Sequence, residues 1–148
     1  LPVPGANLAH VFYVRDKRDA DAMMAALADG AKTAVVIGGG YVGLEAAAVL
    51  RKLGCAVTLI EMLPRLLARV AGEEMSDFLS AEHRAAGVDV RLGEGVRAVL
   101  GEAMGRVTGV VLDSGEELAG DMVVVGIGIV PAVAPLIAAG AAGSGGVD

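Results

Sequence analysis

The chain has 148 residues, of which 55% are hydrophobic and only 3% are aromatic, and its formal net charge is −6. This length suits one ordinary core, which must be built mainly from Ala, Val, Leu and Ile side chains. The acidic balance and the lack of a dense run of Lys and Arg argue against nucleic acid and anionic membrane surfaces as partners.

The first thirty or so residues predict an arm that leads into the main fold. Residues 1–5 lack the charged and apolar regions of a secretory signal, so we expect a cut inside a longer, cytoplasmic protein. Residues 11–14 favour extended structure, and residues 19–28 are predicted to form a helix that packs through Met23, Met24 and Leu27. We therefore assign residues 1–32 to an entry arm with its helix, and residues 33–148 to the main domain.

A strand, a glycine turn and a helix follow one another directly. Residues 34–37 form an apolar run, and Gly38, Gly40 and Gly43 match the G-x-G-x-x-G pattern of dinucleotide-binding turns. In such turns the first glycine permits the sharp exit from the strand, the second lets a diphosphate approach the backbone, and the third lets the helix pack on the sheet. The helix N-terminus then offers free N–H groups to the phosphates. In a glycine-rich chain this pattern is weak by itself and needs a second signal.

That signal is an acidic residue at the end of the next strand. The helix predicted over residues 42–53 stops at Gly54, and residues 56–60 form a buried parallel strand that ends at Glu61. A carboxylate there can accept hydrogen bonds from the ribose hydroxyls of NAD and repel the extra phosphate of NADP, so NADH is favoured and Glu61→Arg is predicted to shift preference toward NADPH. Arg65 leaves two alternatives: a place in solvent or at the ribose edge, which we favour, and contact with a 2′-phosphate.

The second half of the chain changes from helices to short strands. Residues 73–86 are predicted to form a helix with Met75, Phe78 and Leu79 on one face. The predicted strands that follow are residues 88–92, 96–100, 106–112, 117–119 and 122–125. The middle three form a β-meander where an ordinary Rossmann half has a helix. We expect an α/β, Rossmann-like, three-layer nucleotide-binding domain with a parallel sheet and a β-meander crossover.

Other functional groups are sparse in the sequence. Cys55 is the single cysteine and follows the helix stop, where a small buried residue is expected, so neither a dithiol centre nor a zinc site is predicted. His10 and His83 lie far apart without clustered ligands, and we assign no catalytic residue and no metal ligand. The uncharged residues 122–147 contain two prolines and several glycines, which favours a strand, a loop and a short helix over a membrane span.

Together these motifs resemble the NADH-binding domain of the FAD-dependent pyridine nucleotide–disulfide oxidoreductase superfamily. The resemblance is carried by residues 19–22, 38–45 and 121–131, and it is closest to reductases that serve ferredoxin, rubredoxin, putidaredoxin or rhodocoxin-type carriers. It implies a reductase in which hydride passes from NADH to FAD and electrons then pass to an iron–sulfur carrier protein. The FAD domain would lie in other parts of the same polypeptide, so the excised chain is expected to bind NADH without performing the reaction.

The resemblance also implies roles for single residues. Gly38, Gly40 and Gly43 would hold the diphosphate, Glu61 the adenine ribose and Glu45 the nicotinamide carboxamide. Gly126 and Gly128 would let the backbone approach the nicotinamide, and the expected cofactor-binding set is completed by Tyr41, Val42, Arg65 and Ile127. Glu45 can equally be a favourable charge in the first turn of a helix, and Gly126 and Gly128 can simply mark a strand end. Ala132 stands where the family often has Asn.

Two other functions are also compatible with the sequence. One is a non-catalytic NAD-sensing module without a flavin partner, against which the entry arm and the exit at residues 146–148 argue, because both resemble connections to further sequence. The other is a Rossmann domain that binds the ADP half of FAD through the same turn and the same acidic residue. The entry arm favours NAD, because it resembles the crossover from a preceding FAD domain.

Overall fold

The computed structural model describes residues 1–103 and 105–143, so the expected exit at residues 146–148 lies outside the described residues. The elements in chain order are β1 (Val11–Phe12), α1 (Lys17–Ala28), β2 (Thr33–Ile37), α2 (Tyr41–Lys52), β3 (Ala56–Glu61), α3 (Glu73–Ala85), β4 (Val88–Leu92), β5 (Val96–Gly101), β6 (Val107–Leu112), β7 (Glu117–Ala119), β8 (Met122–Val125) and α4 (Ala134–Ala138).

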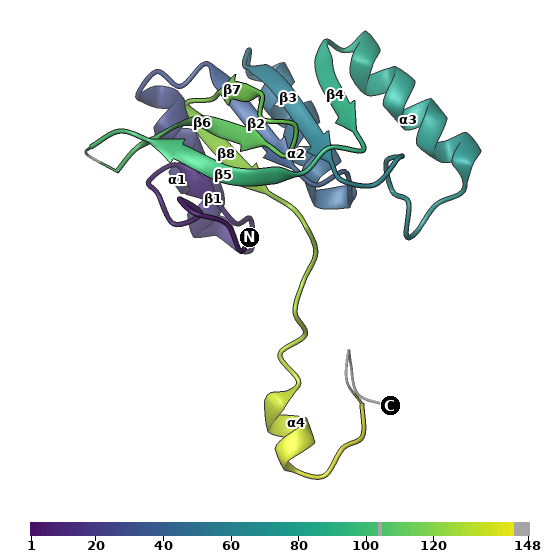
Figure 1. Cartoon of the computed structure of the whole chain (residues 1–148). Helices are drawn as coiled ribbons and strands as arrows, with labels where there is room; N and C mark the ends of the chain where they lie inside the picture. Colours follow the sequence, from purple (N-terminus) through teal and green to yellow (C-terminus); the bar gives the residue numbers. More distant parts are fainter. Residues whose placement is uncertain (104, 144–148) are drawn as a thin grey trace.

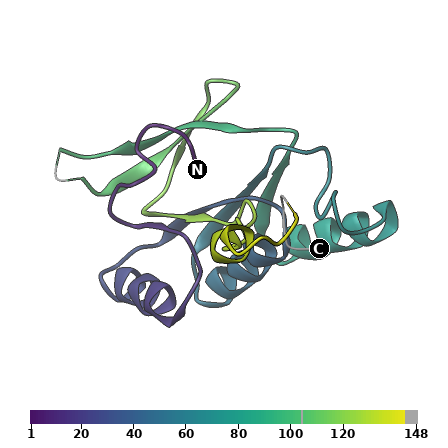
Figure 2. The same cartoon turned by 90° about the horizontal axis from the view of Figure 1, so that it is seen from below.

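Three layers make up the body of the molecule. Five parallel strands form the central sheet in the order β1-β8-β2-β3-β4, and β5, β6 and β7 form an antiparallel sheet of their own. Helices α1, α2 and α3 cover one face of the central sheet, and the β5–β7 sheet lies over the other (Figure 1 and Figure 2). The predicted Rossmann-like fold with a β-meander crossover is confirmed. β1, from the predicted entry arm, belongs to the same sheet.

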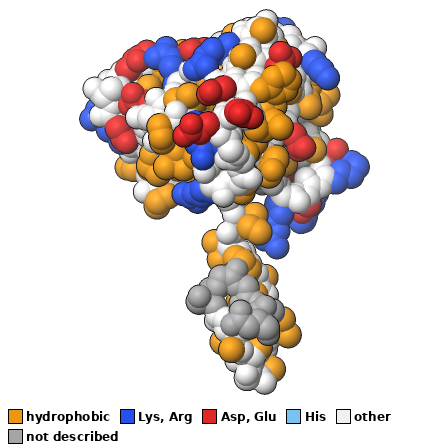
Figure 3. Space-filling model, turned by 90° about the vertical axis from the view of Figure 1, so that its right-hand side faces the viewer, with side chains coloured by type: hydrophobic (Ala, Val, Ile, Leu, Met, Phe, Trp, Pro, Cys, Tyr) orange, Lys and Arg blue, Asp and Glu red, His pale blue; other side chains and the backbone are white. Residues whose placement is uncertain are grey.

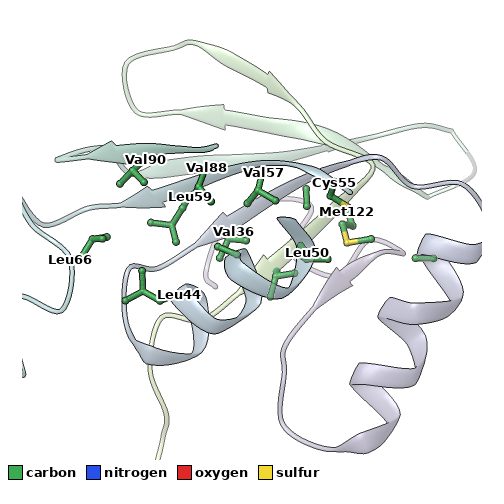
Figure 4. Close-up of a cluster of buried hydrophobic side chains, with 14 of the residues drawn as sticks. Val36, Leu44, Leu50, Cys55, Val57, Leu59, Leu66, Val88, Val90 and Met122 are labelled. Carbon is green, nitrogen blue, oxygen red and sulfur yellow. The ribbon is translucent and has the colours of Figure 1, made fainter. Parts of the chain in front are cut away.

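The central sheet is buried on both faces, because its strands are apolar on both sides. On the helix face Val36 packs in one cluster with Leu50 and Val57, as Figure 4 shows. On the opposite face Val35 and Ile37 pack in a second cluster with side chains of the meander. This two-sided burial explains why β2 and β8 read as continuous apolar runs rather than as alternating patterns.

Helix α1 begins two residues earlier than predicted, because a capping box sets its start. The side chain of Asp16 accepts a hydrogen bond from the N–H of Arg18 (2.8 Å), and the side chain of Asp19 accepts one from the N–H of Asp16 (3.0 Å). The two bonds satisfy N–H groups that have no partner inside the helix. Asp19 is therefore the third residue of the helix and not its first.

The predicted apolar faces of α1 and α3 are partly wrong. Met24, Met75 and Phe78 are exposed, whereas Ser76 and Ser80 are the buried residues of α3. The hydroxyl of Ser76 donates to the carbonyl oxygen of Leu66 (2.5 Å), so this polar side chain is satisfied inside the protein. Hydrophobic periodicity cannot identify a face that is buried through hydrogen-bonded serines.

Beyond β8 the chain leaves the body as an arm, residues 126–143, which carries α4 (Figure 1). Figure 3 shows hydrophobic side chains along this arm, and Ile129 and Val130 are 89% and 94% exposed. The predicted strand, loop and short helix are thus confirmed over the described part of the segment. None of the helices described is long and apolar enough to cross a membrane.

Candidate functional site

The glycine turn and the strand-end acid meet at one edge of the central sheet. β2, β3 and β8 run parallel, so the residues that follow them lie side by side. Backbone hydrogen bonds tie the three ends together: the N–H of Gly38 donates to Ile60 (2.8 Å), and the N–H of Gly126 donates to Ile37 (2.8 Å). The carboxyl edge of a parallel sheet, where α2 begins, is the usual place for a nucleotide.

Gly38 and Gly43 are required by the fold itself. Gly38 has a φ of +109°, and a Cβ there would lie 2.5 Å from the carbonyl oxygen of Gly126. A Cβ on Gly43 would overlap the carbonyl oxygen of Gly38, so this glycine lets α2 press against the end of β2. These two positions match the turn and packing tasks that the sequence predicted.

Gly40 is different, because the surrounding protein does not require a glycine there. Its φ is −84°, which any residue can adopt, and a Cβ would find a single atom within 4 Å, the Gly126 oxygen at 3.9 Å. Gly40 is the N-cap of α2 and supplies no side chain to cap it. The space beside Gly40 is therefore open, and the free N–H groups of the first turn of α2 follow Gly40 directly in the chain.

Glu61, at the end of β3, contacts the glycine turn directly. One carboxylate oxygen accepts a hydrogen bond from the N–H of Gly39 (2.6 Å), and the other accepts one from the N–H of Leu63 (2.7 Å). The side chain is half-buried. Each oxygen keeps a second lone pair, so the carboxylate can still accept a hydrogen bond from a ribose hydroxyl.

The Arg65 side chain is partly buried, and hydrogen bonds within the protein hold its guanidinium in place. Its guanidinium donates to the carbonyl oxygens of Ala71 (2.7 Å) and Ala68 (3.0 Å) and to the hydroxyl of Ser76 (2.9 Å). The solvent alternative for this side chain is wrong, because these bonds fold it over the loop between β3 and α3. Contact with a cofactor stays a prediction for Arg65.

The other predicted residues surround the open start of α2. Tyr41, Val42 and Glu45 are exposed in its first turns, and Ile127 is exposed just beyond β8. Gly128 has a φ of +122°, and a Cβ there would meet nothing within 4 Å. The fold thus brings the glycine turn, the start of α2 and the end of β8 together, while their contacts with a nucleotide stay predictions.

Sequence reasoning missed three residues that shape this site. Gly39 lies so close to its neighbours that a Cβ would be 2.7 Å from Leu66 and 3.0 Å from Glu61. The N–H of Leu67 donates to the carbonyl oxygen of Gly39 (2.9 Å), and Leu66 and Leu67 are both buried. The run of three glycines was a signal for Gly39, but nothing local in the sequence marks the two leucines.

A polar hollow of about 220 Å³ lies at the other end of the strands, lined in part by His10, Arg106 and Asp121. Because it adjoins the starts of β2 and β8, it is separate from the glycine turn.

Cys55 is buried, as predicted, and burial raises the pKa of its thiol. Within residues 1–103 and 105–143, no three His, Cys, Asp or Glu side chains are grouped to hold a metal ion.

Comparison with known proteins gives consistent matches along the whole chain. A family model described as pyridine nucleotide-disulphide oxidoreductase matches residues 1–147. The ferredoxin reductase subunit of a 5,5′-dehydrodivanillate O-demethylase from a Sphingobium species is 55% identical over 148 residues, which are 100% of this chain and 36% of that protein. This chain therefore spans about a third of the length of the relative.

Two solved structures are also closely similar. The ferredoxin reductase for the CYP199A2 system from Rhodopseudomonas palustris has a TM-score of 0.93 and 39% identity, over 99% of this chain and 36% of that one. A covalent putidaredoxin reductase–putidaredoxin complex has a TM-score of 0.90 and 36% identity, with 99% and 36% coverage.

More distant structures differ in their nucleotide. A water-forming NADH oxidase from Lactobacillus brevis, bound to NADH, has a TM-score of 0.84 and 26% identity, over 97% of this chain and 31% of that one. An engineered water-forming NADPH oxidase, bound to NADPH, has a TM-score of 0.82 and 27% identity, with 94% and 30% coverage. These two neighbours thus share the fold and differ in the nucleotide that each binds.

Proposed function

The chain belongs to the pyridine nucleotide-disulphide oxidoreductase family, and from this membership we propose that it forms the NADH-binding part of a longer, FAD-dependent ferredoxin-type reductase. NADH would bind along the carboxyl edge of the central sheet, with its diphosphate at the start of α2. The bound nucleotide supplies hydride to the flavin of the complete protein. This chain contributes binding and orientation.

The open space beside Gly40 is the observation that carries the proposal. Gly38 and Gly43 have structural reasons to be glycine, whereas Gly40 has room for a Cβ and an unstrained backbone. A ligand that approaches the backbone supplies the missing reason. The N–H groups of the α2 first turn, at the positive end of the helix dipole, make that ligand an anion, and a dinucleotide diphosphate suits the extended edge beyond it.

We assign the preference for NADH to Glu61. Its carboxylate lies beside the glycine turn, at the end of the strand next to β2, where the adenosine ribose of a nucleotide bound in this way would lie. A 2′-phosphate would bring a second negative charge close to it. Two such charges at about 4 Å repel by about 4 kcal/mol at an effective dielectric constant near 20, and solvent screening reduces that figure.

The other residues that we propose as contacts lie around the same edge of the central sheet. Glu45 and Tyr41, exposed in the first turns of α2, and the backbone of residues 126–128 would contact the nicotinamide half. The exposed Ile129 and Val130 on the arm support burial against further polypeptide, which we propose to be the FAD domain of the same protein. The electron acceptor would be an iron–sulfur carrier, by analogy with the reductases named above.

The proposal is tested by calorimetric titration of the chain with NADH, NADPH and FAD in parallel at one salt concentration. We expect NADH to bind more tightly than either of the others. A preference for FAD would replace this proposal with a flavin domain. Equal binding of NADH and NADPH would remove the specificity role of Glu61, and failure of all three to bind at millimolar concentration would contradict a nucleotide site in this chain.

A further inference from the structure

We infer that Glu61 is a positioning residue for the glycine turn, which it holds in shape before any nucleotide binds. The inference rests on the proposed function for the identity of the ligand, but its geometry stands in the free protein. The carboxylate would thus act on a dinucleotide in two ways, by contact with the ribose and through the turn that receives the diphosphate.

The carboxylate of Glu61 makes a pair of hydrogen bonds. Its two oxygens accept from the N–H groups of Gly39 (2.6 Å) and Leu63 (2.7 Å), one bond to each oxygen. Both distances are short for N–H donors, as expected when the acceptor carries a charge. One ionised side chain therefore fixes the turn after β2 and the loop after β3 in a single arrangement.

The glycine turn would be flexible without the bond from Gly39 to Glu61. Three glycines in succession, Gly38 to Gly40, restrict the backbone less than any other residues would. Gly39 is held at both of its backbone polar groups, since its N–H donates to Glu61 and its carbonyl oxygen accepts from Leu67 (2.9 Å). Removal of the carboxylate leaves only one of these restraints.

The two bonds to Glu61 also affect how the protein distinguishes NADH from NADPH. Glu61→Arg removes both acceptors and places a cation beside two N–H groups that need a negative partner. The predicted shift of preference toward NADPH should therefore come with a loss of affinity: this variant should bind both nucleotides less tightly than the wild type binds NADH. Tight binding of NADPH at this site requires a new acceptor for Gly39 as well as a new cation.

A ligand without the ribose hydroxyls separates the two roles. The probe is an NADH analogue that lacks the 2′- and 3′-hydroxyls of the adenosine ribose, and the variant is Glu61→Gln, whose NH₂ group must face one of the two backbone donors. Glu94→Gln is the matched control, because Glu94 also accepts a backbone N–H, that of Ser114 (3.0 Å), on the neighbouring loop. Dissociation constants are measured by calorimetry.

We expect Glu61→Gln to weaken binding of the analogue by at least about fivefold, and Glu94→Gln to leave its dissociation constant unchanged. The wild type and Glu61→Gln could instead bind the analogue equally while the wild type still binds NADH more tightly than the variant does. In that case Glu61 acts only through the ribose and the inference is wrong.

Amide hydrogen exchange in the ligand-free protein provides a readout that does not depend on the ligand. Exchange at Gly39 and Leu63 should accelerate by at least about tenfold in Glu61→Gln, with exchange at the buried Val36 unchanged. Unchanged protection at Gly39 would overturn the positioning role even if NADH binds. Accelerated exchange in a protein whose wild type binds no nucleotide would uphold it and reject the proposed function instead.

Discussion

The carbonyl oxygen of Gly38 occupies the space that a Cβ atom on Gly43 would need. This contact brings the first turn of α2 against the end of β2 and sets where the helix N-terminus points. The nearby N-cap, Gly40, takes no part in the close packing. Substitution of Gly43 should therefore lower the stability of the fold, whereas substitution of Gly40 should weaken nucleotide binding and leave the stability nearly unchanged.

Gly43→Ala is expected to lower the free energy of unfolding by about 1–3 kcal/mol, the usual cost of forcing an extra carbon into a packed interior. Alanine favours a helix interior by about 1 kcal/mol over glycine, so the sign of the change is informative. Urea denaturation measures it. A variant as stable as the wild type would mean that α2 does not lie this close to β2.

Gly40→Ala should keep the free energy of unfolding within about 1 kcal/mol of the wild type and weaken NADH binding by at least about tenfold. The new Cβ has room in the free protein but would face the diphosphate. Gly72→Ala is the matched control, because Gly72 is the extended N-cap of α3, and a Cβ there would meet nothing within 4 Å. Equal loss of affinity in both variants, or in neither, would contradict the assignment of the diphosphate to Gly40.

The parts of the fold that the sequence predicted well are those set by local physics. Glycines stop α2 and α3, at Gly54 with a φ of +90° and Gly87 with a φ of +85°. Gly115, with a φ of +95°, closes the hairpin between β6 and β7 and so marks the meander. These positive φ values favour glycine strongly, which is why the boundaries were predictable.

The parts that could not be predicted depend on contacts between distant residues or on backbone acceptors. Arg65 bonds to the carbonyl oxygens of Ala68 and Ala71, and carbonyl groups are present at every residue, so no sequence pattern marks the chosen pair. The bond from Glu61 to Gly39 joins two motifs that were each recognised, but their contact needs the three-dimensional register of β2 and β3.

Arg65→Met is expected to lower the free energy of unfolding by about 1–3 kcal/mol, because three acceptors around the guanidinium lose their donor. The ratio of NADH to NADPH affinity should stay the same. Arg69→Met, at an exposed position on the same loop, serves as the control and should cost less than about 0.5 kcal/mol.

A selective loss of NADPH affinity in Arg65→Met would restore the alternative in which this side chain contacts a 2′-phosphate. A double-mutant cycle with Ser76→Ala tests the mechanism further, since the Arg65 guanidinium donates to the Ser76 hydroxyl (2.9 Å). We expect a coupling of at least about 0.5 kcal/mol, and strict additivity would show that the two residues stabilise the loop independently.

Asp121→Ala tests a hydrogen-bond cluster at the opposite edge of the sheet. One carboxylate oxygen of Asp121 accepts from the N–H of Lys32 (2.8 Å), the N–H of Thr33 (2.8 Å) and the hydroxyl of Thr33 (2.7 Å). The bond from the Lys32 backbone, followed by that from the Thr33 side chain, holds the pKa of Asp121 below its ordinary value. These bonds join the turn before β8 to the start of β2.

The sign of the pH dependence follows from that lowered pKa. A carboxylate whose pKa is lower in the folded state stabilises the fold above the unfolded value of about 3.9, and this stabilisation is lost as the pH falls through the folded-state pKa. Asp121 is exposed, so solvent screening reduces its contribution: Asp121→Ala should cost about 1 kcal/mol at neutral pH, with a gap from the wild type that narrows below about pH 4. The exposed Asp77→Ala on α3 is the control, whose gap should be small throughout. Urea denaturation over this pH range measures both, and a constant Asp121 gap down to about pH 3 would show that the charge of the carboxylate does not contribute.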